Sequence, residues 1–302
     1  MVPFRMAMTP NQPAVAQEWR RTSITRHRSG LGCWELARAR PSPFLQPYVR
    51  EYVGWHESYG VPLWRRELPT EIAPLIINFG DAFRLCEPGT DRRSSALQSF
   101  ITGAFDTFQL VESAGSSTGV QVNLTLLGIR LLVGRPIDDM TNRALAPEDV
   151  LGQFAHDLTA RLHDRTEWDA RFDWLDMALS ARIADARPLS GAVQHTWRRI
   201  VLSGGRIGIR TIVDEVGWSQ RHFIRQFRRE FGLSPKVLAR ILRFDRVVRA
   251  IDENPRGDLA DLALDAGYYD QSHLNRDVRA FAGITPGQLA QRRLPDSGGL
   301  LA

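Results

Sequence analysis

The chain carries an internal repeat near its C-terminus, where residues 216–235 and 266–286 show the same order of glycine, aromatic, histidine, glycine and proline. The two histidines, His222 and His273, lie 51 residues apart, and the two closing prolines are equally far apart. The copies differ in length by one extra residue between the glycine and the histidine of the second. Such a repeat indicates a duplicated structural unit, so both copies should fold alike.

Each copy is predicted to form a helix, a tight turn and a second helix. An apolar run with helical spacing precedes Gly217 and Gly267. Glycine can end a helix there because it adopts the left-handed conformation without a Cβ clash. Ser219 and Asp270 are natural N-caps for the second helix. The pattern therefore predicts two helix-turn-helix units, each followed by a helix that begins at Ser-Pro or Thr-Pro.

The second helix of each unit carries the functional pattern. In the first copy, four arginines share one face, opposite the apolar face of Phe223 and Phe227. In the second copy, Ser272, Arg276 and Arg279 face outward. A helix fits the major groove of DNA, where Arg recognises guanine and Gln or Asn recognises adenine. An arginine-rich face is more often only a solvated surface, but two tandem copies favour DNA binding.

The segment between the two units is predicted to be a single helix. Its apolar residues keep helical spacing from Val237 to Ile251. A helix of about fifteen residues is roughly 23 Å long. That length suits two recognition helices on successive faces of the major groove, roughly 34 Å apart.

Over residues 204–293, the chain resembles the AraC/XylS family of transcriptional regulators. The shared motifs are a Gly-Trp-Ser or Gly-Tyr pair, an arginine three residues after each histidine, and Gly-x-Ser/Thr-Pro at the end of both units. The resemblance implies that bases are contacted by Arg221, Ile224 and Arg225 and by Gln271, Ser272, Asn275 and Arg276. Further along the same helices, the predicted phosphate contacts are Arg228, Arg229 and Arg279. The family usually has Phe where this chain has Val278, which predicts a looser second unit.

The charge distribution agrees with this assignment. Residues 191–302 contain 18 Lys and Arg against 12 Asp and Glu, a net charge of +6. Residues 1–190 contain 21 against 22, a net charge of −1. Because DNA phosphates supply most sequence-independent affinity, a basic excess confined to the C-terminal part is expected of a regulator with a separate sensing domain.

The N-terminal part is predicted to be rich in β-structure. Strand patterns occur at residues 75–79, 100–103, 109–112 and 120–124, and two helices with apolar positions at Val150–Leu162 and Phe172–Ile183 follow. This order predicts a small barrel or sandwich closed by two helices. The predicted fold class is α+β: a β-barrel, cupin-like N-terminal domain with two closing helices, then an all-α domain of two tandem helix-turn-helix units joined by a linker helix.

Four segments follow from these patterns. Residues 1–40, rich in Pro, Gln, Ser and Arg, are predicted to be poorly ordered. Residues 41–187 form the sensing and dimerisation domain, and residues 188–295 the DNA-binding domain, with a hinge near Pro188. Residues 296–302 are predicted to be a flexible tail.

The N-terminal region also resembles an uncharacterised N-terminal domain of AraC-like regulators, through residues 75–81 and 127–134. Members of the family commonly carry a cupin-type barrel there that binds a small molecule and dimerises. The resemblance therefore implies an unknown small-molecule effector and a homodimer. The candidate pocket residues are aromatic, although aromatic residues on strands are more often plain core: Trp55, Trp64, Phe79 and Phe83.

The main alternative is a cupin-like metalloenzyme fused to a helix-turn-helix domain. Such a metal site needs clustered His and carboxylate ligands, and no His-x-His pair lies on any predicted strand. Nucleophile elbows, phosphate loops and zinc spacings are also missing from the sequence. We therefore predict no catalytic residue, no metal site and no cofactor. A third possibility is an architectural DNA-bending protein without an effector.

The remaining sequence features bear on the compartment. Cys33 and Cys86 stand alone, as expected of free thiols in a reducing cytoplasm. No apolar run approaches the 18 residues typical of a membrane-spanning helix, and the first residues do not read as a signal peptide. The expected protein is a bacterial, cytoplasmic, nucleoid-associated regulator of transcription. Its expected partners are double-stranded DNA and RNA polymerase; the operator and the choice between activator and repressor are not encoded in these patterns.

Overall fold

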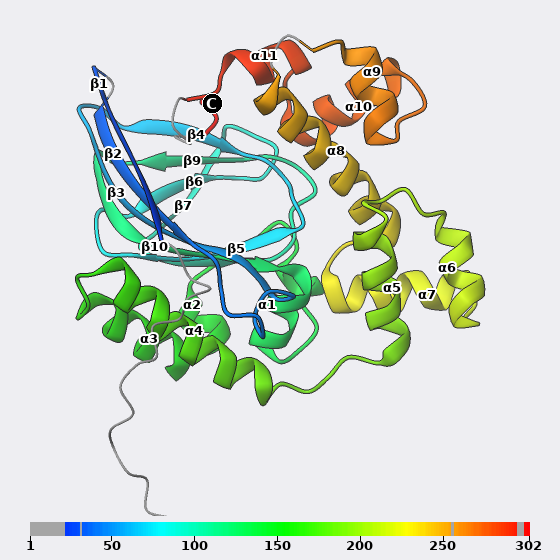
Figure 1. Ribbon diagram of the computed structural model, residues 1–302, viewed down its shortest axis with the longest axis horizontal. Helices are drawn as coiled ribbons and strands as arrows, with labels where there is room; N and C mark the ends of the chain where they lie inside the picture. The colour runs from blue at the N-terminus through cyan, green and yellow to red at the C-terminus, as the bar shows by residue number, and fades with distance from the viewer. Residues whose placement is uncertain (1–21, 31, 255–256, 295–298) are drawn as a thin grey trace, which may run out of the picture.

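The computed structural model describes residues 22–30, 32–254, 257–294 and 299–302. Two antiparallel sheets and several helices form the N-terminal region, and a purely helical region follows (Figure 1). The predicted α+β class, with β-structure first and helix-turn-helix units last, is confirmed.

The two sheets contain all the described strands, and every listed pairing among these strands is antiparallel. The larger sheet consists, in spatial order, of β1 (Ser23–Ser29), β2 (Gly32–Ala39), β3 (Val49–Tyr59), β10 (Ser116–Thr125), β5 (Ile72–Asn78), β8 (Phe100–Thr102) and β11 (Ala144–Leu145). The smaller sheet consists of β4 (Leu63–Glu67), β9 (Gln109–Ser113), β6 (Phe83–Cys86) and β7 (Arg93–Leu97). The four predicted strand segments correspond to β5, β8, β9 and β10.

The expectation that residues 1–40 are poorly ordered is wrong for the part that the structure describes. β1 and β2 pair along their whole length, from Ser23 with Arg38 to Ser29 with Gly32. β1 is an edge strand with mostly exposed side chains, and its charged residues hide the alternation that identifies a half-buried strand. Residues 1–21 lie outside the described residues.

Helices cover the outer face of the larger sheet (Figure 1). They are α1 (Leu126–Val133), α2 (Pro147–Leu151), α3 (Gln153–His163) and α4 (Trp168–Ala184), with a short 3₁₀ turn, η1 (Asp138–Met140). Gly54 of β3 lies beneath Trp168 of α4, where any Cβ would overlap the indole ring. The predicted helix from Val150 to Leu162 is two helices, because Gly152 adopts a φ of 60° between α2 and α3.

The helical region begins with α5 (Gly191–Leu202). The first unit consists of α6 (Ile209–Val216) and α7 (Gln220–Phe231), and the second of α9 (Leu259–Ala266) and α10 (Gln271–Ala282). The linker is α8 (Pro235–Glu253), and α11 (Pro286–Gln291) closes the second unit. At 19 residues, α8 is longer than the fifteen predicted, about 28 Å, because it begins directly at Pro235.

The predicted ends of these helices are confirmed. Gly217 and Gly267 have φ of 67° and 88°, in the left-handed region. The Ser219 hydroxyl accepts a hydrogen bond from the backbone N–H of His222, and the Asp270 carboxylate accepts one from that of His273. Both recognition helices therefore begin at the same point of the repeat.

The helical region packs directly against the sheets. One continuous hydrophobic cluster includes Ile129 and Phe172 of the N-terminal region together with Phe223, Phe244 and Phe281 of the helical region. A smaller cluster lies between the two sheets. The two regions therefore share a core, and the predicted hinge at Pro188 lies in the connection between α4 and α5.

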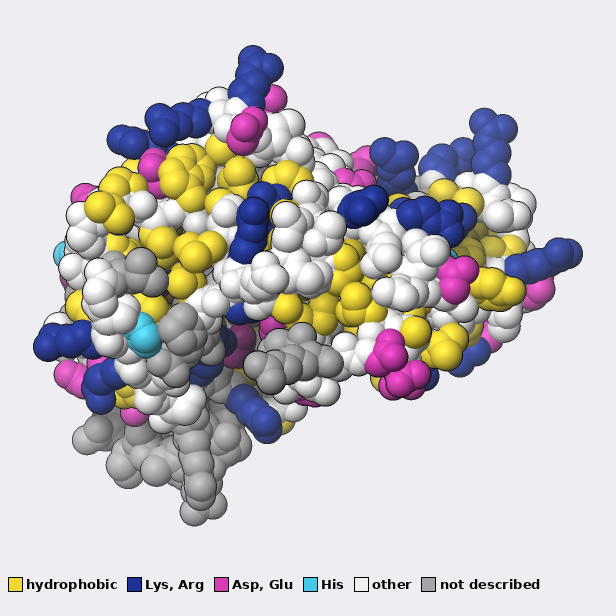
Figure 2. Space-filling model, turned by 90° about the horizontal axis from the view of Figure 1, so that it is seen from above, with side chains coloured by type: hydrophobic (Ala, Val, Ile, Leu, Met, Phe, Trp, Pro, Cys, Tyr) yellow, Lys and Arg dark blue, Asp and Glu magenta, His cyan; other side chains and the backbone are white. Residues whose placement is uncertain are grey.

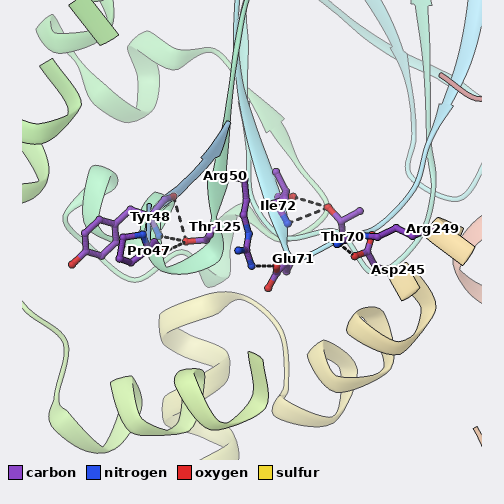
Figure 3. A network of polar contacts seen from close by, with 10 residues as sticks. Pro47, Tyr48, Arg50, Thr70, Glu71, Ile72, Thr125, Asp245 and Arg249 are labelled. Atoms are coloured by element: carbon purple, nitrogen blue, oxygen red, sulfur yellow. Dashed lines mark hydrogen bonds and ion pairs between the residues drawn. The ribbon is translucent and has the colours of Figure 1, made fainter. Parts of the chain in front are cut away.

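Polar contacts join the two regions at several points. The Thr141 hydroxyl donates to the carbonyl of Gly232 (3.0 Å), and Arg130 of α1 forms an ion pair with Glu230 of α7. Figure 3 shows Asp245 and Arg249 of α8 beside Thr70 on the loop between β4 and β5, next to the Arg50–Glu71 pair. The first helix-turn-helix unit and the linker helix are thus anchored to the N-terminal region.

The last four residues form a further contact, which we call the C-terminal tail (residues 299–302). The backbone N–H of Arg66 in β4 donates to the carbonyl of Leu300 (2.8 Å), and the N–H of Ala302 donates to the carbonyl of Trp64 (3.2 Å). The prediction of a flexible tail at 296–302 is therefore wrong for residues 299–302, because their backbone groups pair with an edge strand. Residues 296–298 lie outside the described residues.

Candidate nucleic-acid interface and effector cavity

The first recognition helix, α7, presents the predicted face to solvent. Phe223, Phe227 and Phe231 are buried beneath it. The predicted DNA-contacting residues on the opposite face are all exposed: Arg221, Ile224, Arg225, Arg228 and Arg229. Figure 2 shows Lys and Arg side chains projecting from the end of the molecule where α6 and α7 lie in Figure 1.

The charge on this face is not neutralised within the described part of the chain. None of the four arginines forms an ion pair with a described acidic side chain, and Arg225 lies 3.2 Å from Nδ1 of His222. Glu230, the acidic residue of α7, is paired with Arg130 of α1 instead. The face is thus free to meet the phosphates and base edges of DNA.

The second recognition helix, α10, is built in the same way. Gln271, Ser272, Arg276 and Arg279 are exposed, whereas Asn275 is half-buried and its Oδ1 has no hydrogen-bond partner. Arg276 folds along its own helix, with Nε 3.4 Å from the carbonyl of Ser272. The predicted base-contacting residues of each unit therefore share one helix face.

Buried contacts fix α10 to the linker helix. Asp277, the acidic residue of α10, is buried and accepts from Arg240 of α8 at 2.7 Å. The rings of Phe244 and Phe281 pack 5.3 Å apart. Val278 is completely buried beside them, so the packing does not support the predicted looseness of the second unit.

The structure identifies the extra residue of the second copy as Tyr269. Trp218 packs edge-on against His222 in the first unit, and Tyr268 packs edge-on against His273 in the second. Tyr269 has no counterpart in the first unit and is 87% exposed, directly before the N-cap Asp270. Comparing the two copies at the inserted position would have revealed it from sequence.

We predict that Tyr269 contacts the DNA backbone, because tyrosine hydroxyls commonly bind phosphate and the N-terminus of α10 faces the groove in our assignment. Tyr269→Phe should weaken binding to specific and non-specific duplexes alike, by about 1 kcal/mol. Fluorescence anisotropy with both duplexes measures this. A loss confined to the specific duplex would contradict a backbone contact.

A cavity of about 390 Å³ lies between the two sheets. Of the predicted pocket residues, Trp55 and Phe83 line it, whereas Trp64 and Phe79 do not. Phe79 instead packs against Arg171 (5.1 Å) and His163 (5.5 Å) on the other face of the sheet, and Trp64 packs against Arg93 (5.7 Å). Both were wrongly predicted as pocket residues.

The polar wall of the cavity did not follow from the sequence patterns. Arg65 of β4 forms an ion pair with Glu57 of β3 (2.9 Å) and also contacts the hydroxyl of Tyr59. Burial and the neighbouring Glu57 raise the pKa of Tyr59 above its usual range. Two residues after Arg65, Glu67 lines the cavity with an exposed side chain, and desolvation by the surrounding protein raises its pKa.

Within the described ranges, no three His, Cys, Asp or Glu residues come together in a group that could hold a metal ion. Among the described helices, none is both long and apolar enough to cross a membrane.

The C-terminal region matches a known family model, described as a helix-turn-helix domain, over residues 212–292. This range spans α7 to α10, and thus both recognition helices. The C-terminal region therefore carries a helix-turn-helix domain, as the repeat predicted.

Comparison with solved structures gives distant matches. ToxT from Vibrio cholerae O395 is 9% identical with a TM-score of 0.43, over 76% of this chain and 96% of ToxT. Unsaturated fatty acid bound ToxT from Vibrio cholerae strain SCE256 gives 9% and 0.43, over 76% and 94%. The AraC-like transcriptional activator CuxR gives 16% and 0.20, over 80% and 86%. No curated protein matches the sequence.

Proposed function

We propose that this protein is a sequence-specific, DNA-binding regulator of transcription whose activity responds to a small molecule. The observation that carries the proposal is the pair of helix-turn-helix units, each with an exposed arginine face free of acidic partners among the described residues. Such faces supply both phosphate attraction and base recognition. No described residue cluster favours the alternative of a metalloenzyme.

In this proposal, α7 and α10 enter successive major-groove faces of one duplex. The base-contacting residues are Arg221, Ile224 and Arg225 in α7 and Gln271, Ser272, Asn275 and Arg276 in α10. Arg228, Arg229 and Arg279 contact phosphates. Arg225 and Arg276 occupy the same position of the repeat, three residues after His222 and His273, so we expect them to have the same role.

The effector part of the proposal rests on the cavity between the sheets. Its wall includes Arg65 and Glu67 of β4, and the same strand binds the C-terminal tail. Arg66 of β4 also donates to the carbonyl of Ala282 at the end of α10 (2.9 Å). A molecule in the cavity would therefore touch the strand that anchors the second recognition helix.

Arg225→Ala tests the base-contacting role. If Arg225 pairs with a guanine through two hydrogen bonds, its loss should reduce sequence discrimination by about 1–3 kcal/mol. Genome-wide mapping of bound sites would first supply the specific duplex. The ratio of specific to non-specific affinity, measured at one fixed salt concentration, is the relevant quantity.

Arg229→Ala is the matched control, because it removes an arginine of the same helix that is assigned to phosphate. It should weaken binding to all duplexes equally. Arg276→Ala should behave like Arg225→Ala in the second unit. An unchanged specificity ratio for Arg225→Ala would rule out its base-contacting role.

The proposal includes a homodimer, which would raise affinity for paired sites through high effective concentration. The apolar positions that predicted this dimer, from Val150 to Leu162 and from Phe172 to Ile183, are largely packed inside the chain instead. The homodimer is therefore expected only from the gain in affinity that it would bring at paired DNA sites. Sedimentation of the full chain with and without DNA should show twice the monomer mass; a monomer under both conditions would exclude the dimer.

The proposed setting is the bacterial nucleoid, in the cytoplasm, with RNA polymerase as a further candidate partner. The boundary near Pro188 between a sensing region and a DNA-binding region belongs to the same proposal. A pull-down of RNA polymerase by the protein on its bound DNA would test the partner directly.

A further inference from the structure

We infer that the cavity between the sheets binds a small organic cation, a protonated amine with an apolar or aromatic body, and that Glu67 holds its positive charge. The inference rests on the proposed function and deepens it, because it names the chemical class of the effector. Three features of the cavity carry it: its size and apolar wall, its unbalanced charge, and a buried hydroxyl without a partner.

The size and the apolar wall suit a small molecule. At about 390 Å³, the cavity falls within the range of natural ligand sites, roughly 300–1,000 Å³. One wall is apolar and includes Trp55, Phe83 and Phe100, with Ile76 and Leu85. Aromatic rings offer both apolar contact and attraction for a cation, and Trp offers the strongest attraction.

The charge of the polar wall is negative. Arg65 and Glu57 form an ion pair and so balance one another. Glu67 is left as a second carboxylate facing the same cavity, and no hydrogen bond or ion pair joins it to any described residue. The nearby Arg293 is engaged by Asp252 at 2.7 Å. The Glu67 side chain is exposed at the cavity, so its carboxylate is open to pair with a bound cation there.

A buried hydroxyl without a partner lines the same cavity. Thr102 of β8 lines the cavity, is 5% exposed, and its Oγ1 has no hydrogen-bond partner. Buried polar groups in proteins are rarely left without a partner. An ammonium group bound by Glu67 has three N–H donors, so one ligand could also satisfy a hydroxyl that lines the cavity.

The same geometry disfavours an anionic ligand. The guanidinium of Arg65 is already occupied by Glu57 and by the hydroxyl of Tyr59. An anion placed in the cavity would lie close to Glu67 and would be repelled by it. A neutral ligand would gain no charge attraction from the Glu67 carboxylate.

Three probes of similar shape and different charge test the inference on the full chain. Phenethylamine is cationic at neutral pH, phenethyl alcohol is neutral, and hydrocinnamate is anionic. Isothermal titration calorimetry should show binding of the amine with affinity at least about tenfold above that of the other two. Equal or tighter binding of the alcohol or of hydrocinnamate would overturn the inference, and so would no amine binding at about 10 mM.

Glu67→Gln removes the charge and keeps the shape of the side chain. It should weaken phenethylamine binding at least about tenfold, and the variant should fold, because the exposed Glu67 side chain has no hydrogen bond or ion pair with a described residue to lose. Glu167→Gln is the matched control, since Glu167 is likewise exposed, before the start of α4, but does not line the cavity, and it should bind the amine normally. Unchanged amine affinity in Glu67→Gln would overturn the assignment of the charge.

Thr102→Val supplies a second variant that does not change the charge. It should weaken amine binding several-fold while the thermal unfolding of the free protein changes little, because the hydroxyl has no partner to lose. DNA binding of the same preparations separates this inference from the proposed function. Salt-dependent DNA binding without amine binding overturns only the inference; a preparation that binds amine but no duplex overturns the proposed function.

Discussion

Raising the salt concentration from about 50 to about 200 mM should lower the affinity of the chain for duplex DNA by roughly a thousandfold or more. The reason is the number of exposed arginines on the two recognition helices, because each positive charge held against the duplex, at a phosphate or at a base edge, displaces counterions. They are Arg221, Arg225, Arg228, Arg229, Arg276 and Arg279. Six such contacts predict a slope of about −5 for the logarithm of the association constant against the logarithm of salt.

Single variants should show how much each arginine contributes to this salt dependence. Arg228→Ala removes one exposed charge from α7 and should reduce the slope by about 1. Arg130→Ala removes an arginine that is buried against Glu230, and we expect a smaller change in the slope because Arg130 does not face DNA. Affinity that is independent of salt, or absent at the lower salt concentration, would contradict the proposed interface.

Asp277→Ala should destabilise the protein by about 3–5 kcal/mol, because it leaves Arg240 without its buried partner. Asp277 is almost completely buried, and the pair is held by hydrogen bonds from both Nε and Nη2 of Arg240. The cost arises from desolvation of the remaining charge and not from the lost attraction alone. Urea unfolding, followed by circular dichroism, gives the free energy of unfolding directly.

Two variants provide the controls for this prediction. The double variant Arg240→Met with Asp277→Leu replaces the pair by apolar side chains and should recover most of the lost stability. Asp265→Ala removes an exposed carboxylate from α9 and should cost no more than about 0.5 kcal/mol. A cost for Asp277→Ala as small as that of Asp265→Ala would show that the pair does not stabilise α10.

Local sequence patterns were sufficient for the helix-turn-helix region. The glycines that end helices and the side chains that cap them act within a few residues, so Gly217, Ser219, Gly267 and Asp270 could be identified without knowledge of the tertiary structure. The exposed arginine faces followed from helical periodicity. The assignment of each arginine to bases or phosphates remains a prediction.

The N-terminal region depends on features that sequence patterns do not specify. The two wrongly predicted pocket residues differ from their neighbours only in strand parity: Arg65 and Glu67 line the cavity, so Trp64, which directly precedes Arg65, faces away. Likewise, Ile76 lines the cavity, and Phe79 lies an odd number of residues further along the same segment, so it belongs to the opposite face. Which face of a strand points inward depends on how the sheets pair, and that is a non-local property.

The pairing of the C-terminal tail with β4 also bears on aggregation. β4 is an edge strand of the smaller sheet, and an uncovered edge presents a row of free N–H and C=O groups on which a strand from another molecule can add. Leu300 and Ala302 occupy hydrogen-bonding positions of that edge beside Arg66 and Trp64. Release of the tail would therefore open a template for intermolecular strand addition, and solutions of the protein would then be prone to concentration-dependent self-association through the sheet.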